Sequence, residues 1–317
     1  MEKRQKIMYS ILILFGILAV CLTGCLDNTS AGRIGVLVTI VPQAEMVEYI
    51  GGDYIDVTVM VPTGQDPHSY EPTPEQMKKV AQAKAYFKVG SGVEFEVIHM
   101  DAILEQNSGL HVFDCSEDIT VISFDEHYGQ EEHHEDEEDE HEEEEHDDEE
   151  GDEHDHDGTD PHIWLSPENF QKMAEVVYNG LIEIDSEHQD DYYANYQSYT
   201  SKLDSLHSNV STLLEPYGGN SYMVYHPAWG YFGDTYHLHM IAIEDEGKQP
   251  GPAGIDAIIS QALDHNITVI FVAPQFDTSS AETIADEIDG EVVFANPLMT
   301  DYEETITKLA EDIVTGF

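Results

Sequence analysis

Apolar residues in the first third of the chain gather into short blocks that alternate between two periodicities. Residues 35–41 (GVLVTIV) form a continuous apolar and β-branched run, which predicts a strand buried on both faces. The blocks that follow alternate in the same way. The predicted strands are residues 55–61 and 85–89, and the predicted helices are residues 43–50, 73–83 and 94–106. Alternation at this spacing predicts βαβ units and a mostly parallel sheet.

A second series of the same kind occupies the last third of the chain. Its predicted strands are residues 221–225, 240–244, 268–272 and 291–294, and its predicted helices are residues 252–265, 279–288 and 302–315. Two separate series of this kind predict two α/β lobes.

Two longer helical stretches, residues 166–184 and 187–214, lie between the two series. The second carries apolar or aromatic residues at helical spacing: Tyr192, Tyr196, Tyr199, Leu203, Leu206, Val210, Leu213 and Leu214. One unbroken helix between two lobes would be a stiff connector. The pattern alone fits an ordinary surface helix within one domain equally well.

The N-terminus has the pattern of a secretory signal. Three basic residues within positions 1–6 precede the uncharged apolar run 7–22, which ends at Leu-Thr-Gly-Cys25. This ending resembles a lipobox, in which the cysteine is lipidated and becomes the first mature residue. We therefore predict a signal peptide at 1–24, a lipid anchor on Cys25 and a tether over 25–33, which place the protein on the extracytoplasmic face of the membrane. The alternative is an uncleaved signal anchor.

Cysteine usage limits the chemistry of any metal site. Cys21 lies in the predicted signal peptide and Cys25 would be lipidated, so Cys115 is left without a disulfide partner. With no thiolate cluster, a metal site must be built from imidazole and carboxylate groups.

The chain is strongly acidic, with a formal net charge of −53. Residues 125–157 supply 22 of the 65 acidic residues and no basic one, and the remainder still carries −31. Such a surface argues against a nucleic-acid partner, because phosphate binding needs clustered lysine and arginine. Adaptation to a salty milieu, where screening relieves the repulsion, is one hypothesis for the remaining acidity.

Three histidines follow or adjoin predicted strand ends and are candidates for one metal site. His68 lies in Gly-Gln-Asp-Pro-His-Ser-Tyr, His162 in Asp-Pro-His-Ile-Trp, and His226 directly after a predicted strand. Ligands of open α/β sheets bind at such edges, and imidazole suits zinc. Each histidine alone also fits a surface or hydrogen-bonded role, and separations of 94 and 64 positions do not prove that the three converge.

Residues 126–157 combine carboxylates with seven histidines and almost no apolar side chains. Such a segment cannot bury a core, so we predict a disordered loop. The seven imidazoles would bind metal weakly and collect it near a tighter site: His127, His133, His134, His141, His146, His154 and His156. The alternative is an acidic loop that only interacts with solvent.

Five stretches resemble the zinc and manganese substrate-binding proteins of ABC importers. They are residues 64–72 (GQDPHSYEP), 160–167 (DPHIWLSP), 226–232 (HPAWGYF), 269–276 (VIFVAPQF) and 295–298 (ANPL). The resemblance implies an N-terminal lobe over 34–187, a rigid linker helix over 188–215, a C-terminal lobe over 216–317, and a metal held in the cleft between the lobes. It also implies that the metal ligands are His68, His162 and His226.

The fourth ligand departs from the family pattern. The family places an acidic residue where this chain has Asn296. A neutral amide is a poor ligand for zinc. The fourth coordination position could therefore be filled by water, Glu71, Asp301 or a residue of the histidine-rich loop in place of Asn296. The loss of a hard carboxylate favours zinc, the transported ion, over manganese.

The resemblance implies a monomeric receptor that delivers its metal to the membrane subunit of an ABC permease and performs no catalysis. One alternative is an extracytoplasmic zinc-dependent hydrolase, because hydrolases also keep an open position on zinc. The sequence shows no motif for a general base or a substrate pocket. A metal-buffering or adhesin-like surface protein is a further alternative, and the lipid anchor fits it equally well.

Overall fold

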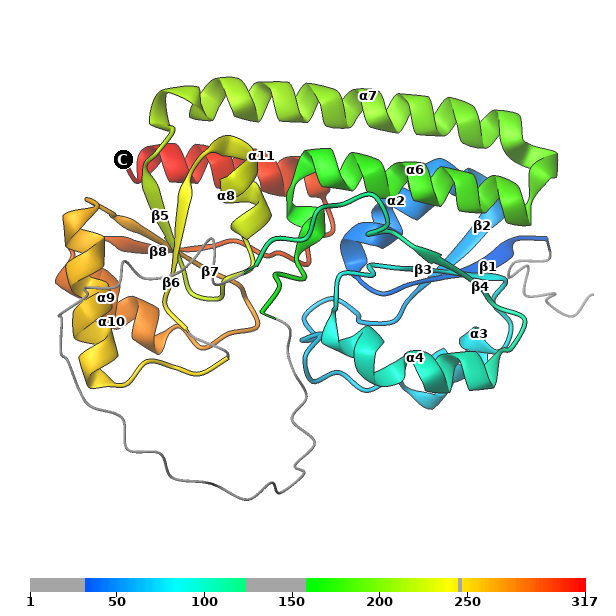
Figure 1. Ribbon diagram of the computed structural model, residues 1–317, viewed down its shortest axis with the longest axis horizontal. Helices are drawn as coiled ribbons and strands as arrows, with labels where there is room; N and C mark the ends of the chain where they lie inside the picture. The colour runs from blue at the N-terminus through cyan, green and yellow to red at the C-terminus, as the bar shows by residue number, and fades with distance from the viewer. Residues whose placement is uncertain (1–31, 124–157, 245–246) are drawn as a thin grey trace, which may run out of the picture. The chain divides into compact units, whose positions relative to one another are not determined.

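Two four-stranded parallel sheets form the frame of the protein (Figure 1). The computed structural model describes residues 32–123, 158–244 and 247–317, and all its elements lie in the compact unit Ile34–Phe317. The N-terminal sheet has the order β2-β1-β3-β4, with β1 at Ile34–Val38, β2 at Ile55–Val59, β3 at Ala85–Lys88 and β4 at His111–Asp114. The C-terminal sheet has the order β6-β5-β7-β8, with β5 at Ser221–Val224, β6 at His239–Ala242, β7 at Val269–Val272 and β8 at Glu291–Phe294.

Each lobe is a sheet with its own helices. The helices of the N-terminal lobe are α2 (Val41–Gly51), α3 (Pro74–Val80), α4 (Glu94–Gln106) and α6 (Pro167–Ile184). Those of the C-terminal lobe are α8 (Gly230–Tyr236), α9 (Pro252–Asp264), α10 (Ser279–Glu287) and α11 (Tyr302–Thr315). Short 3-10 turns cover Gly52–Tyr54, Ile163–Leu165, Ser186–His188 and Glu215–Tyr217. The predicted α/β architecture with parallel sheets is confirmed.

Local sequence explains where several helices begin. The Thr73 hydroxyl accepts a hydrogen bond from the Gln76 backbone N–H at 3.2 Å, and the Gln76 side chain accepts from the Thr73 N–H at 2.9 Å. This reciprocal capping box starts α3 one residue later than predicted. Asp301 caps α11 by accepting a hydrogen bond from the Glu304 N–H at 2.9 Å. The side chains of Thr73 and Asp301 are therefore hydrogen-bonded to the backbone at the starts of α3 and α11.

The long helix α7 (Gln189–Leu214) joins the two lobes. It contacts α2 and α6 of the N-terminal lobe and α11 of the C-terminal lobe, and it runs along all three in Figure 1. Its apolar side chains face these helices, since Tyr192, Tyr199, Leu203 and Leu206 are buried. The helix is therefore a packed connector, which decides between the two interpretations that the sequence pattern allowed.

One hydrophobic cluster continues through both lobes. It extends from β1 and β3 through α6 and α7 to α11, and it includes Val36, Phe87, Phe170, Leu206 and Leu309. A second cluster fills the space between the C-terminal sheet and the helices α9 and α10. The sheet faces that α2, α6 and α11 contact thus share one core with the inner side of α7.

Several predictions concern residues that the structure does not describe. The signal peptide 1–24, the lipidated Cys25 and the histidine-rich segment 126–157 all lie outside the described residues. Among the residues that are described, none of the helices has the length and apolar character required to span a bilayer.

Candidate metal centre

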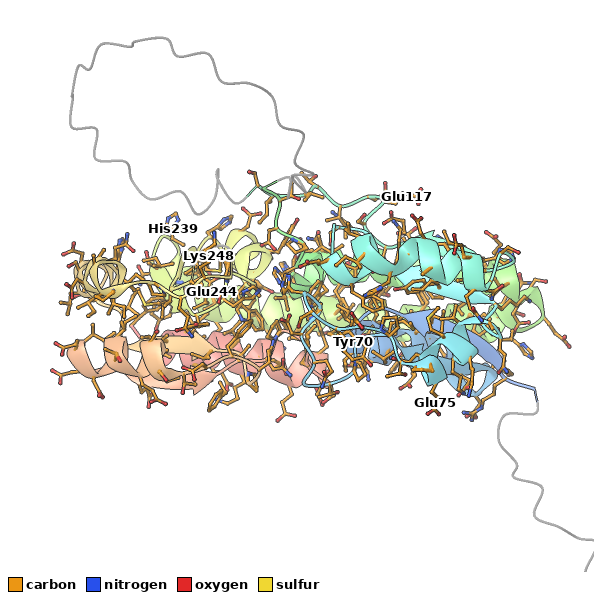
Figure 2. The ribbon with its side chains drawn as sticks, turned by 90° about the horizontal axis from the view of Figure 1, so that it is seen from below. Tyr70, Glu75, Glu117, His239, Glu244 and Lys248 are labelled. Carbon is orange, nitrogen blue, oxygen red and sulfur yellow. The ribbon has the colours of Figure 1, made fainter. Side chains whose placement is uncertain are left out.

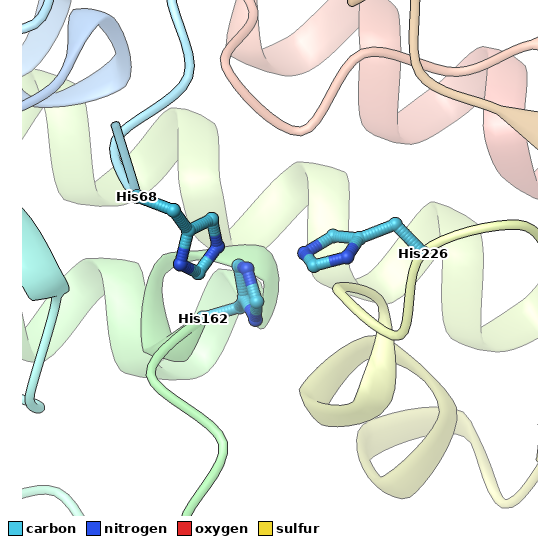
Figure 3. A group of neighbouring side chains, drawn as sticks. All are labelled: His68, His162 and His226. Carbon is cyan, nitrogen blue, oxygen red and sulfur yellow. The ribbon is translucent and has the colours of Figure 1, made fainter. Parts of the chain in front are cut away.

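His68, His162 and His226 converge on one point between the lobes (Figure 3). Each offers one ring nitrogen, and these three atoms all lie within 4.8 Å of one another. The ring centroids of His68 and His226 are 5.6 Å apart, and those of His162 and His226 are 5.3 Å apart. In the described part of the chain, no second group of three or more His, Cys, Asp or Glu side chains is close enough to hold a metal ion.

The three histidines come from different segments that the fold brings together. His68 lies in the loop after β2, His226 in the loop after β5, and His162 directly before the turn Ile163–Leu165. The loops after β2 and β5 both leave the carboxyl end of a parallel strand, which is the edge where open α/β sheets bind ligands. Topology therefore accounts for the meeting of His68 and His226, and His162 joins them from the segment that leads into α6.

The two Asp-Pro-His motifs fix the backbone in the same way. The Asp66 Oδ1 accepts the His68 backbone N–H at 3.0 Å, and the Asp160 Oδ1 accepts the His162 N–H at 2.9 Å. The two motifs differ at the ring. Asp160 also binds the Nδ1 of His162 at 2.7 Å, whereas the Nδ1 of His68 binds Glu94 of α4 at 3.1 Å.

The third imidazole has a carboxylate partner as well. The Nδ1 of His226 forms a short hydrogen bond with the Oε1 of Glu244, which follows β6. The other side of the His226 ring stacks on Phe276 at a centroid distance of 4.9 Å. The sequence pattern did not predict Glu94 or Glu244 as partners of the ligands. The only signal for Glu244 was an acidic residue at the end of a predicted apolar strand.

The three ligand side chains differ in burial, and His68 is the most exposed. The His68 side chain is 42% exposed, that of His226 is 14% exposed, and that of His162 is 8% exposed. Burial lowers the pKa of His162 below its ordinary value, against the opposing effect of Asp160. His162 is therefore neutral at neutral pH, as a metal ligand must be.

A cavity of about 400 Å³, including space open to solvent, surrounds the histidines. Trp164, which lies 5.2 Å from the His162 ring, forms part of its wall. The other lining residues are Asp66, Pro67, Val93, Glu94, Pro161, Gln275, Phe276, Pro297 and Leu298. Among the described residues of this lining, none is lysine or arginine, so the walls are apolar, neutral or acidic.

The three candidates for the fourth ligand have other surroundings in the structure. The amide of Asn296 forms two hydrogen bonds with the backbone of Leu298, at 3.0 and 3.1 Å. Asp301 caps α11, and Glu71 is exposed. Neither Asp301 nor Glu71 belongs to the group of converging histidine, cysteine and acidic side chains, and none of the three candidates lines the cavity that the structure describes.

The sequence family follows from a comparison with known proteins. The family described as zinc-uptake complex component A, periplasmic (ZnuA) matches residues 36–316. This chain belongs to the ZnuA family. Its members are binding proteins that do not catalyse a reaction, so the alternative of a zinc-dependent hydrolase is set aside.

Relatives of this ZnuA-family chain include proteins named for two metals. The manganese-binding lipoprotein MntA of Halalkalibacterium halodurans is 25% identical over 308 residues, which cover 94% of this chain and 90% of the relative. The high-affinity zinc uptake system protein ZnuA of Bacillus subtilis is 27% identical over 292 residues, which cover 92% and 85%. A crystal structure of ZnuA superposes with a TM-score of 0.77 at 30% identity and covers 90% of this chain and 99% of its own.

The family and the histidine group together define the class of protein. The chain is a metal-binding receptor for the ABC import of zinc or manganese, and three histidines between its lobes form the metal site.

Proposed function

We propose that this ZnuA-family protein captures zinc, and manganese only weakly, outside the cytoplasmic membrane and delivers it to the membrane subunit of an ABC permease. One observation carries the choice of metal. The converging group consists of three imidazoles, and no carboxylate of the described chain joins it.

The chemistry of this donor set favours zinc. Zinc accepts three nitrogen ligands and a fourth light ligand in a tetrahedron, whereas manganese prefers carboxylate, carbonyl and water oxygens. A site of three imidazole nitrogens therefore discriminates against manganese through the type of ligand.

We further propose that a water molecule completes the tetrahedron. The Asn296 amide and the Asp301 carboxylate would each have to give up hydrogen bonds to the backbone before they could reach the metal. Water needs no such rearrangement. Among the three candidates, Glu71 is the one whose side chain forms no hydrogen bond to the backbone within the described residues. Co²⁺-substituted protein tests the assignment, since the variants Asn296→Ala and Asp301→Ala should leave the visible absorption bands of a four-coordinate ion unchanged.

The predicted accessory parts fit this function. A lipid on Cys25 would hold the receptor beside its permease on the extracytoplasmic face of the membrane, and the receptor would act as a monomer. The seven histidines within residues 126–157 would collect zinc near the tight site. The residues that flank this segment support the second idea, because Ser123 pairs with Thr159 only three positions before His162.

Zinc and manganese titrations of the mature protein against a competing chelator test the proposal. We expect one tight zinc site in the wild type, a much weaker manganese affinity, and loss of the tight site in the double variant His68→Ala/His226→Ala. Deletion of residues 126–157 should remove only weak sites. Equal affinities for zinc and manganese, or a tight zinc site that survives the double substitution, would refute the proposal.

A zinc-limited growth assay separates a transport receptor from a metal-buffering surface protein. If the protein delivers zinc to a permease, cells that lack it should regain growth on low zinc with the wild-type chain and fail with the double variant. A buffering protein would predict the same growth with both chains.

A further inference from the structure

Each histidine of the metal centre binds a carboxylate through the ring nitrogen Nδ1. The pairs are His68 with Glu94, His162 with Asp160, and His226 with Glu244. None of these three carboxylates belongs to the converging ligand group itself. They form an outer layer that holds the imidazoles.

This arrangement has a direct consequence for the state of each ring. A neutral imidazole carries its proton on one nitrogen and a lone pair on the other. A carboxylate can only accept a hydrogen bond, so it favours the tautomer with the proton on Nδ1. The lone pair is then on Nε2, where it can bind a metal.

The outer carboxylates come from fixed positions in the fold. Glu94 is the first residue of α4, and Glu244 follows β6. The Glu244 side chain is 4% exposed and that of Asp160 is 0% exposed, while that of Glu94 is 31% exposed. Figure 2 shows Glu244 in the C-terminal lobe and Tyr70, which lies in the same loop as His68, in the N-terminal lobe.

We propose that Glu94, Asp160 and Glu244 are positioning residues that set the Nδ1–H tautomer and the ring orientation of the three ligands before any metal arrives. The idea rests on the proposed function, because it assumes that the three Nε2 atoms receive the ion. It adds that the chain prepares the ligands in the metal-free state. Loss of such outer partners typically lowers metal affinity about 10–100-fold.

Asp160 offers the sharpest test of positioning against charge. Its Oδ1 accepts both the His162 ring N–H and the His162 backbone N–H. In the variant Asp160→Asn, the backbone N–H should hold the amide oxygen in the same place, so the acceptor survives while the charge is lost. In Asp160→Ala both are lost.

The tautomers can be measured directly in the metal-free protein. Long-range ¹H–¹⁵N correlation spectra of ¹⁵N-histidine-labelled protein distinguish Nδ1–H from Nε2–H rings. We expect Nδ1–H for all three ligands in the wild type and for His162 in Asp160→Asn. The Ala variants of Glu94, Asp160 and Glu244 should each shift only their own partner toward Nε2–H, the tautomer that free histidine favours.

Zinc affinity supplies the second measurement. Each Ala variant should bind zinc about 10–100-fold more weakly, and Asp160→Asn should lose less than Asp160→Ala. Glu94 is partly exposed, so Glu94→Ala should fold even if a buried variant does not. The matched control is Asp101→Ala, which removes an exposed carboxylate from the same helix α4 and should change neither tautomer nor affinity.

The tautomer decides the outcome. If the Nδ1–H form persists in Glu94→Ala and in Asp160→Ala, the proposal is overturned whatever their zinc affinities. If the tautomers shift as expected but wild-type protein binds no zinc tightly, the positioning stands and the proposed choice of metal fails.

Discussion

Removal of a single hydroxyl group should weaken the junction between the lobes behind the metal site. Tyr302 is the first residue of α11, and its ring stacks on Phe170 at a centroid distance of 3.9 Å. Its hydroxyl donates a hydrogen bond to the Trp164 carbonyl at 2.8 Å, and the Trp164 indole donates to the Pro297 carbonyl at 2.8 Å. Tyr302→Phe removes the first bond and keeps the ring.

The expected loss follows from burial. Tyr302 is 1% exposed and Trp164 is 2% exposed, so water cannot easily replace the lost donor. Leaving one buried partner without its bond costs about 1–3 kcal/mol of unfolding free energy. Burial also raises the pKa of Tyr302 well above its ordinary value, so the hydroxyl remains a protonated donor throughout the neutral range.

Urea unfolding of the metal-free mature protein measures this loss. With a slope of about 3 kcal/mol/M, the midpoint should fall by roughly 0.3–1 M while the slope stays constant. The matched control is Tyr193→Phe on α7, because that side chain is 51% exposed and its hydroxyl should contribute little. A loss for Tyr302→Phe no larger than that of the control would refute the reasoning.

Three further predictions concern the packing and the pH dependence. Gly180→Ala in α6 would place a Cβ atom 2.5 Å from the ring of Phe87. The overpacking should cost about 1–3 kcal/mol of unfolding free energy, which exceeds the gain of at most about 1 kcal/mol from replacing a helical glycine. A rise in the urea midpoint would contradict this. Ser166→Ala should cost roughly 0.5–1 kcal/mol, because the serine hydroxyl caps α6 through the Asn169 N–H at 3.4 Å. Because burial depresses the pKa of His162 in the folded state, its contribution to stability is complete above the unfolded value of roughly 6.5 and is lost as pH falls from there to the lowered pKa. Urea unfolding of metal-free wild type and His162→Gln from pH 7.5 to 5 should show a shallower pH dependence in the variant.

The fold could be predicted from the sequence where the pattern was strong. The helices at residues 94–106 and 302–315 and the strand at 291–294 begin and end where the pattern indicates. The strand β4 was missed because its four residues begin with an exposed histidine and carry only partly buried side chains. The helix α8 was missed because its seven residues directly follow the segment Pro-Ala-Trp and are too few to show a helical period.

The metal site was predictable only in its inner layer. Two of its histidines stand in Asp-Pro-His motifs, which the sequence displays directly. The outer carboxylates Glu94 and Glu244 lie 26 and 18 positions from their histidines. Such pairings depend on how loops at the carboxyl ends of different strands meet, and one sequence contains no signal for that.

The histidine–carboxylate pairs also explain what the lobes must do. His68 and Glu94 both belong to the N-terminal lobe, His226 and Glu244 both belong to the C-terminal lobe, and His162 has its partner two residues away. Each ligand is therefore oriented within its own lobe or segment, independently of the other lobe. The distances between the three ligands, by contrast, depend on the junction that Trp164 forms with Pro297. A change at that junction should lower zinc affinity without changing any tautomer, whereas loss of an outer carboxylate should change both.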